Sequence, residues 1–479
     1  MPNPYATAVE LLDLLRRGEA SALELTDMYL DRIEALNPAI NAVVWQDAEG
    51  ARAAAREVAG PPTDEQPLLG LPITVKEAYG LVGSPTTWGN PDYRNNVSTE
   101  DALAVQRLKA AGAIVMGKTN VPLNLADFQS YNDIYGQCNN PYNLARTPGG
   151  SSGGSAAALA AGLSALEMGS DIGGSIRTPA HFCGLFGHKP TWALVPSRGH
   201  ALPGMVAEPD IAVIGPMARS AFDLELALDI VAGADEFEPG VRYELPGLPE
   251  AGVAGLRIGV WANDAACPVS RETESRVHLV ADALRGLGAT VDMDAKPDLT
   301  GAESDGVYRP LLWSLMTAGS PKATVEAWKA LVENAAPDDD SEALRMARAA
   351  TMDHTTWLRQ NHARDRLRWK WHAFFQDYDA LIAPEFAIPA IAHDHRPFGQ
   401  RTLKVDNEET PYYQHIFWAG LMGISRLPST VVPTGLGEEG LPIGIQIVGN
   451  AQSDRLTIQI AQALETAGMR FEPPAAFPA

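Results

Sequence analysis

A stretch rich in glycine and serine between residues 149 and 191 constrains the fold of this chain more than any other part of it. It contains two serine-bearing glycine turns, GGSSGGS at 149–155 and DIGGS at 171–175. The residues between them, 156–166, are small and apolar with high helix propensity. The stretch therefore predicts a loop, a buried helix, a short strand and a second loop.

The same two turns suggest acyl-transfer chemistry. Glycine has no Cβ, so backbone N–H groups can point into a cavity. A serine hydroxyl beside such donors provides a nucleophile next to a site for a tetrahedral oxyanion. Gly/Ser runs are more often linkers, here around an Ala-rich helix. Spacing and composition alone leave both interpretations open, although the apolar segment between the turns disfavours exposed linkers.

Composition narrows the class of protein. The chain of 479 residues is 46% hydrophobic, with 59 acidic against 37 basic residues and a formal net charge of -22. This charge disfavours nucleic acid and anionic membranes as partners. Three cysteines without a CxxC motif predict neither a disulfide framework nor a zinc site. The N-terminus does not resemble a signal peptide, and no window approaches the ~20 apolar residues of a membrane helix. We therefore expect a cytoplasmic location.

Helical and strand patterns alternate along the chain, which predicts an α/β protein with a mostly buried sheet. Residues 7–36 have the pattern of a helical hairpin with Ser21 as an N-cap. The region 338–375 is expected to be helical, and 394–412 to be a polar, mobile loop. The other expected helices are 50–59, 101–111, 222–233, 272–287 and 454–466, and the expected strands are 69–75, 113–117, 256–261, 289–293, 380–383 and 441–448.

Taken together with its other motifs, the chain resembles the amidase signature family. The matching segments occur in order along nearly the whole chain: GLPITVKEAYG at 70–80, GKTNVP at 117–122, NNPYNLARTPGGSSGGSAAALAAG at 139–162, GSDIGGSIRTPAHFCGLFGHKPT at 169–191, GPMARS at 215–220 and LPIGIQIVG at 441–449. The resemblance implies one domain over 1–479, with a large twisted mixed sheet covered by helices on both faces. It places a core of family type at about 70–235 and a variable helical, substrate-side region at about 300–375.

The resemblance also implies a Ser–cis-Ser–Lys triad. Ser175 would be the nucleophile, Ser151 the bridging serine after a cis peptide bond, and Lys76 the base. The backbone N–H groups of Ile172, Gly173 and Gly174 would form the oxyanion hole. No cofactor and no metal would be needed.

Elementary chemistry agrees with a lysine base. The ten histidines are scattered, and His181 and His188, those nearest the core, lie in an apolar context. Burial disfavours an ammonium and lowers the pKa of a lysine. Lys76 follows the apolar run LPITV, so burial is expected, although a strand-end lysine taken alone is more often exposed.

Further residues are expected around the triad. Asp171 and Arg177 flank the nucleophile turn and would hold it by hydrogen bonds, while Ser152 would support the proton relay. Three segments, 128–131, 200–205 and 311–316, are candidates for the substrate pocket. Their candidate residues are Phe128, Gln129, Tyr131, Met205, Leu312 and Met316.

These expectations lead to an amidase acting on a small-molecule amide or carbamate, as a monomer or homodimer. A rival function within the family is that of the A subunit of a glutamyl-tRNA amidotransferase. The region 300–375 favours the stand-alone enzyme, because it has LLWSLM at 311–316 and a tryptophan-rich segment in place of a tyrosine-rich one. An inactive binding protein with the same fold is also possible. An unrelated α/β hydrolase is a weaker possibility, since its strand–elbow–helix context is not evident.

Overall fold

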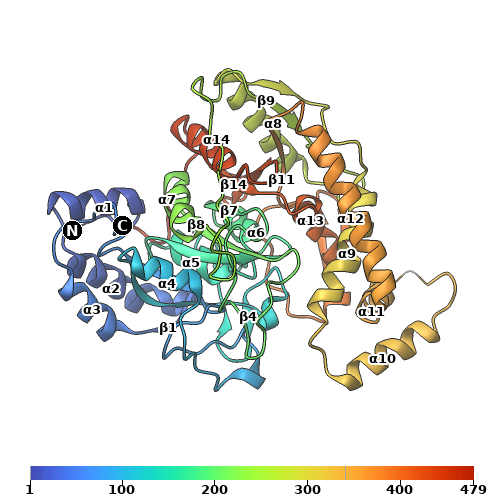
Figure 1. Cartoon of the computed structure of the whole chain (residues 1–479), viewed down its shortest axis with the longest axis horizontal. Coiled ribbons are helices and arrows are strands. Elements are labelled where there is room, and N and C mark those ends of the chain that lie inside the picture. The colour runs from blue at the N-terminus through green and yellow to red at the C-terminus, as the bar shows by residue number, and fades with distance from the viewer. Residues whose placement is uncertain (1, 340) are drawn as a thin grey trace.

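A mixed eight-stranded sheet forms the centre of the computed structural model, which describes residues 2–339 and 341–479 (Figure 1). Neighbouring strands pair antiparallel except β10–β9 and β9–β11, which are parallel. The predicted α/β class is confirmed. In spatial order the strands are β10 (Thr290–Asp292), β9 (Arg257–Val260), β11 (Ala380–Pro384), β15 (Pro442–Gly449), β14 (Ser429–Leu436), β7 (Phe186–Lys189), β8 (Val213–Ala218) and β6 (Glu167–Asp171).

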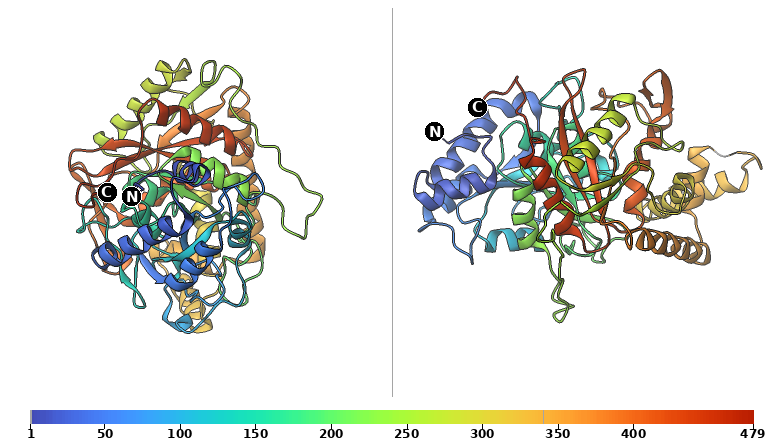
Figure 2. Two further views of the ribbon diagram at one scale, coloured as in Figure 1. Left: turned by 90° about the vertical axis from the view of Figure 1, so that its left-hand side faces the viewer. Right: turned by 90° about the horizontal axis from the view of Figure 1, so that it is seen from above.

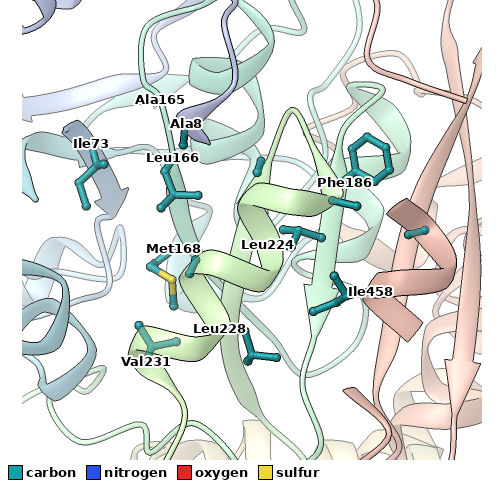
Figure 3. Close-up of a cluster of buried hydrophobic side chains, with 14 of the residues drawn as sticks. Ala8, Ile73, Ala165, Leu166, Met168, Phe186, Leu224, Leu228, Val231 and Ile458 are labelled. Carbon is teal, nitrogen blue, oxygen red and sulfur yellow. The ribbon is translucent and has the colours of Figure 1, made fainter. Parts of the chain in front are cut away.

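Helices cover both faces of this sheet. On one face lie α7 (Ala221–Val231), α8 (Arg271–Gly286) and α14 (Asp454–Thr466), and on the other α5 (Gly153–Ala160) and α6 (Arg177–Phe182). Each of the first three buries an apolar stripe of helical spacing against the sheet. Figure 3 shows Leu224 and Leu228 of α7 beside Phe186 of β7 and Ile458 of α14. Helix α5 ends at Ala160, earlier than the predicted 166, because Gly162 has φ +66°.

The N-terminal part of the chain forms a second layer around a three-stranded sheet of order β1 (Val43–Gln46), β3 (Ile114–Thr119) and β2 (Pro72–Lys76). Ile73 of β2 belongs to the same buried cluster as Met168 of β6, so the two sheets share one apolar core (Figure 3). The predicted hairpin is confirmed as α1 (Ala8–Arg17) and α2 (Ala22–Ile40), with Ser21 as N-cap. Two more helices pack nearby, α3 (Ala48–Glu57) and α4 (Leu103–Ala110).

The chain ends close to where it begins. The N- and C-termini lie side by side in each view (Figures 1 and 2). Arg32 of α2 donates hydrogen bonds to the carbonyls of Gly162, 3.0 Å, and Pro478, 3.1 Å. The last residues are therefore fastened to the N-terminal layer.

Further helices, which lie between residues 301 and 374, occupy the side opposite the termini (Figure 1). The single helical region expected at 338–375 is divided in two, because Asp353 caps a new helix by accepting the Thr356 N–H at 2.8 Å. The helices of this region are α9 (Gly301–Met316), α10 (Lys322–Glu333), α11 (Glu342–Ala350) and α12 (His354–Phe374). Helix α13 (Phe417–Gly423) packs on α9.

The prediction of a loop at 394–412 is wrong, since the segment contains the hairpin β12 (Thr402–Val405) and β13 (Glu408–Pro411). A second short hairpin joins β4 (Tyr131–Asn132) and β5 (Gly136–Gln137). Within the described residues, no helix has both the length and the apolar character needed to cross a bilayer.

Candidate active site

The predicted triad residues come from three segments that the fold brings together. Lys76 is the last residue of β2, which packs beside β6. Ser175 lies in the turn between β6 and α6, and Ser151 lies in the turn before α5. The two turns touch, because the Ser152 N–H donates to the Ser175 carbonyl at 3.1 Å. The Gly150–Ser151 peptide bond is cis.

Lys76 is completely buried, and its amine is surrounded by serine hydroxyls. Nζ lies 2.6 Å from Ser151 Oγ, 3.0 Å from Ser152 Oγ and 2.9 Å from Ser170 Oγ. No carboxylate of the described residues comes within ion-pair distance of it. Burial lowers the pKa of Lys76 to about 7, although the more distant charges of Asp171 and Glu77 act in the opposite direction. The lysine is thus poised to change protonation near neutral pH.

Ser170 is a contact of the amine that sequence reasoning missed. It precedes Asp171 on β6, and its N–H donates to Ser152 Oγ at 3.2 Å. The Ser152 hydroxyl in turn lies 3.3 Å from the Ser170 carbonyl. Both serines therefore fix the position of Nζ. The signal in the sequence is a hydroxyl on the strand that leads directly into the nucleophile turn.

Asp171 and Arg177 form a buried ion pair that shapes this turn. Arg177 Nε donates to Asp171 Oδ2 at 3.0 Å and Nη2 to Oδ1 at 2.9 Å, with both side chains fully buried. The carboxylate also accepts the N–H groups of Gly174, 2.9 Å, and Ile176, 3.2 Å. Burial alone would raise the pKa of Asp171, but Arg177 and these donors hold it at about 2.

The amides proposed for the oxyanion hole differ in availability. The Gly174 N–H is donated to Asp171, whereas those of Ile172 and Gly173 have no acceptor among the described residues. The Tyr308 hydroxyl donates to the Ile172 carbonyl at 3.1 Å. A Cβ on Gly173 would lie 2.7 Å from Tyr308 Oη and 2.8 Å from Ile416 Cδ1, so a larger residue there would push these side chains away. Two backbone donors without an acceptor in the described structure, the N–H groups of Ile172 and Gly173, thus lie at this turn, and the Tyr308 hydroxyl fixes its backbone.

Ser175 is 8% exposed and faces a small cavity. In the part of the chain that the structure describes, its hydroxyl makes no hydrogen bond, so the link to Ser151 that a relay needs is open here. The cavity has a volume of about 40 Å³. Besides Ser175, its lining is mostly apolar or aromatic and includes three of the candidate pocket residues, Phe128, Leu312 and Met316.

The other three candidate pocket residues lie elsewhere. Gln129 Nε2 donates to the Asp394 carbonyl at 2.9 Å, and the Tyr131 ring stacks on His395 with centroids 3.8 Å apart. Met205 is 49% exposed. None of the three lines the cavity at Ser175. Gln129 and Tyr131 instead contact the 394–412 segment, which lies more than 260 residues away in the chain. These contacts direct both side chains away from the cavity at Ser175.

A much larger cavity, of about 880 Å³, adjoins the small one. Trp313 and Tyr413 line both cavities, and their rings meet edge to face with centroids 5.2 Å apart. The outer cavity also contains Arg309, Arg348 and Arg401 in its walls. The aromatic pair therefore separates a tight apolar space at Ser175 from a wide, partly charged one.

Neither core histidine is placed to serve as the base. His181 lies between the backbone of Gly444, 2.9 Å, and Ile388, 3.0 Å. His188 contacts Thr430 and Asp454. Among the described residues no group of three His, Cys, Asp or Glu side chains could hold a metal ion.

Comparisons with known proteins agree with this geometry. The sequence profile of the family described as Amidase matches residues 24–458. The A subunit of glutamyl-tRNA(Gln) amidotransferase from Roseiflexus sp. (strain RS-1) is 34% identical over 96% of both chains. Fatty-acid amide hydrolase 2-A of Danio rerio is 32% identical over 97% of this chain and 89% of its own.

Solved structures give the same result. A bacterial aryl acylamidase of the amidase signature enzymes superposes with a TM-score of 0.82 at 25% identity, over 99% of both chains. A 6-aminohexanoate cyclic dimer hydrolase has a TM-score of 0.80 at 26% identity, over 99% of this chain and all of its own. These relatives define a class of hydrolases that act on amide C–N bonds. The chain belongs to the amidase signature family.

Proposed function

We propose that this protein is an amidase that hydrolyses the C–N bond of a small-molecule amide, releasing a carboxylic acid and an amine or ammonia. The observation that carries the proposal is the Lys76 amine. It is buried, has no carboxylate partner in the described structure, and lies 2.6 Å from Ser151 Oγ. A lysine of this kind can be neutral near pH 7 and accept a proton from a hydroxyl.

The mechanism that we propose runs through an acyl-enzyme. Neutral Lys76 takes the proton of Ser151, which takes that of Ser175, and Ser175 Oγ attacks the carbonyl carbon. The oxyanion is stabilised by the free N–H groups of Ile172 and Gly173. The proton returns through Ser151 to the leaving amine, and water then releases the acid from Ser175. Gly174, the third expected donor, contributes less because its N–H is already donated to Asp171.

The cavities suggest the form of the substrate. The group next to the scissile bond is compact and apolar, because it must fit among Phe128, Leu312 and Met316. The remainder lies in the outer cavity past Trp313 and Tyr413. Ester and carbamate carbonyls need the same nucleophile and oxyanion donors, so we include them as substrates.

We further propose a cytoplasmic monomer or homodimer that uses neither metal nor cofactor and binds neither nucleic acid nor membranes. The formal net charge of -22 supports the last two points. The three cysteines, all buried and free, are compatible with a reducing compartment.

Two substitutions test the proposal. Ser175→Ala should abolish hydrolysis of a panel of p-nitroanilides, primary amides and carbamates, and Lys76→Ala should reduce kcat/KM at least ~10²-fold. A fluorophosphonate should label the wild-type protein at Ser175. Wild-type turnover by the Ser175→Ala variant would refute the assignment. An unlabelled, inactive wild-type protein would favour a binding protein with the same fold.

The similarity to one chain of a glutamyl-tRNA(Gln) amidotransferase supports a second candidate, a protein that releases ammonia from glutamine within a complex. Purification from the native host separates the two. A stoichiometric second chain, with glutaminase activity that depends on it, would favour the amidotransferase. Hydrolysis of amides by the isolated chain favours the stand-alone amidase.

A further inference from the structure

A buried glutamate that the triad does not use lies against the nucleophile turn. Glu385 follows β11 inside the apolar run ALIAPEFAIPA, 380–390, and is completely buried. Its Oε1 accepts a hydrogen bond from Thr178 Oγ1 at 2.9 Å, while its Oε2 is buried without a partner in the described structure. A buried polar atom without a partner is costly, so it calls for an explanation.

Glu385 reaches the turn at Gly174. A Cβ on Gly174, which has φ +102°, would lie 2.5 Å from Thr178 Oγ1 and 3.0 Å from Glu385 Oε1. The Thr178 N–H also donates to the Gly174 carbonyl at 2.6 Å. Glu385, Thr178 and Gly174 thus form one contact group directly before the nucleophile Ser175.

The charges around Glu385 are already balanced. Within the described residues, the charged groups that face it are Arg177 of α6 and Asp171 of β6, which form a bidentate pair with each other. Lys189 of β7 interacts with this pair, and burial lowers the pKa of Lys189 to about 7. The remaining Arg177 nitrogen, Nη1, donates to Gln446 Oε1 at 3.0 Å. A second carboxylate here would be an uncompensated buried charge, which is strongly unfavourable.

We propose that Glu385 is a positioning residue of the proposed amidase that must be protonated for catalysis, because its negative charge would oppose the oxyanion at the Ile172 and Gly173 amides. Burial raises the pKa of Glu385 to about 8, against the opposing effect of Arg177. Together with the pKa of Lys76 at about 7, this gives an active form with both groups neutral. The pH profile of kcat/KM should therefore be bell-shaped, rising with Lys76 and falling with Glu385.

The inference rests on the proposed function, and Glu385→Gln tests it separately. The amide is isosteric, keeps an oxygen for Thr178 and does not ionise. Wild-type kcat/KM on a p-nitroanilide should fall about sevenfold from its maximum near pH 7.5 to about pH 9, because the two pKa values, about 7 for Lys76 and about 8 for Glu385, lie one pH unit apart. In Glu385→Gln the fall should be absent, with a change below about twofold over the same range.

Two further variants keep the test decisive. Glu167 is another fully buried glutamate with a pKa raised to about 8 by burial, but it contacts Thr74 and not the turn. Glu167→Gln should therefore keep the alkaline fall. If Glu385→Gln does not fold, as judged by its circular dichroism melt, Thr178→Val serves in its place and should move the alkaline fall to higher pH, because it removes a hydrogen bond that favours the carboxylate.

The outcomes separate this inference from the proposed function. An unchanged alkaline fall in Glu385→Gln, or in Thr178→Val where that variant is needed, overturns the role of Glu385 while Ser175-dependent hydrolysis still stands. A wild-type protein that hydrolyses no amide and is not labelled by a fluorophosphonate overturns the proposed function, and this inference with it.

Discussion

Removing the Ser170 hydroxyl should shift the pH dependence of activity in a direction that the contacts of Lys76 determine. Ser170 Oγ lies 2.9 Å from Nζ and is one of three hydroxyls around it. A hydrogen bond from a charged donor contributes about 1 kcal/mol more than one from a neutral donor. Ser170→Ala therefore withdraws more stabilisation from the ammonium than from the amine, and the pKa of Lys76 falls.

The size of the pKa shift follows from this difference in hydrogen-bond energy. At about 1.36 kcal/mol per pH unit, a loss of about 1 kcal/mol lowers the pKa by roughly 0.7 unit. In the proposed mechanism neutral Lys76 is the active form, so activity is present above the pKa of Lys76 and is lost below it. The acid limb should move from about pH 7 toward lower pH. At about pH 6 the fraction of plateau activity should rise roughly three- to fourfold.

The assay is kcat/KM on a p-nitroanilide across the acid limb, each variant normalised to its own plateau. Ser155→Ala is the matched control, because Ser155 Oγ is buried but contacts Thr119 Oγ1 at 2.8 Å and not Nζ. An acid limb that stays in place or moves to higher pH in Ser170→Ala would refute our account of the lysine environment.

Two more predictions concern stability and selectivity. Asp171→Asn leaves the buried Arg177 guanidinium without its anion and should lower the free energy of unfolding, measured by urea denaturation, by about 3–5 kcal/mol. The control Asp13→Asn, in an exposed ion pair, should leave that free energy unchanged. An equally small effect of both substitutions would contradict the argument from the buried pair. Trp313→Ala opens the small cavity, so kcat/KM for a bulky acyl anilide relative to acetanilide should rise at least about tenfold. Trp369→Ala, at a site 70% exposed, should not change this ratio, and no gain in Trp313→Ala would show that the aromatic pair does not limit access.

Local pattern was sufficient for much of the fold. The apolar run that ends at Lys76 is a buried strand, and residues 454–466 form the closing helix as predicted. Pattern failed where tertiary contacts decide the structure. The polar segment 402–411 has the composition of a loop, but its hairpin is held by the buried ion pair of Arg401 with Asp127. Strand β14 contains Pro433, which weakens a strand pattern taken alone.

The candidate site shows the same division. Motifs bring the two serine turns and Lys76 to attention, because each contains residue types that acyl transfer requires. They do not reveal Ser170 or Glu385, whose importance depends on which strands lie side by side. A single glutamate in the apolar run at 380–390 was the available signal for the latter. Loop residues such as Tyr131 cannot be placed without knowing their distant partners.

Because the candidate site is divided between two sheets, it can form only late in folding. Lys76 belongs to the three-stranded sheet, whereas the strand leading to Ser175 belongs to the eight-stranded one. Until the two join, the serine keeps the low reactivity of an ordinary alcohol. In the proposed mechanism, a nascent, truncated or partly degraded chain that lacks either sheet does not activate this serine toward amides or esters. In the proposed mechanism, activation of Ser175 therefore requires that both sheets have folded and joined.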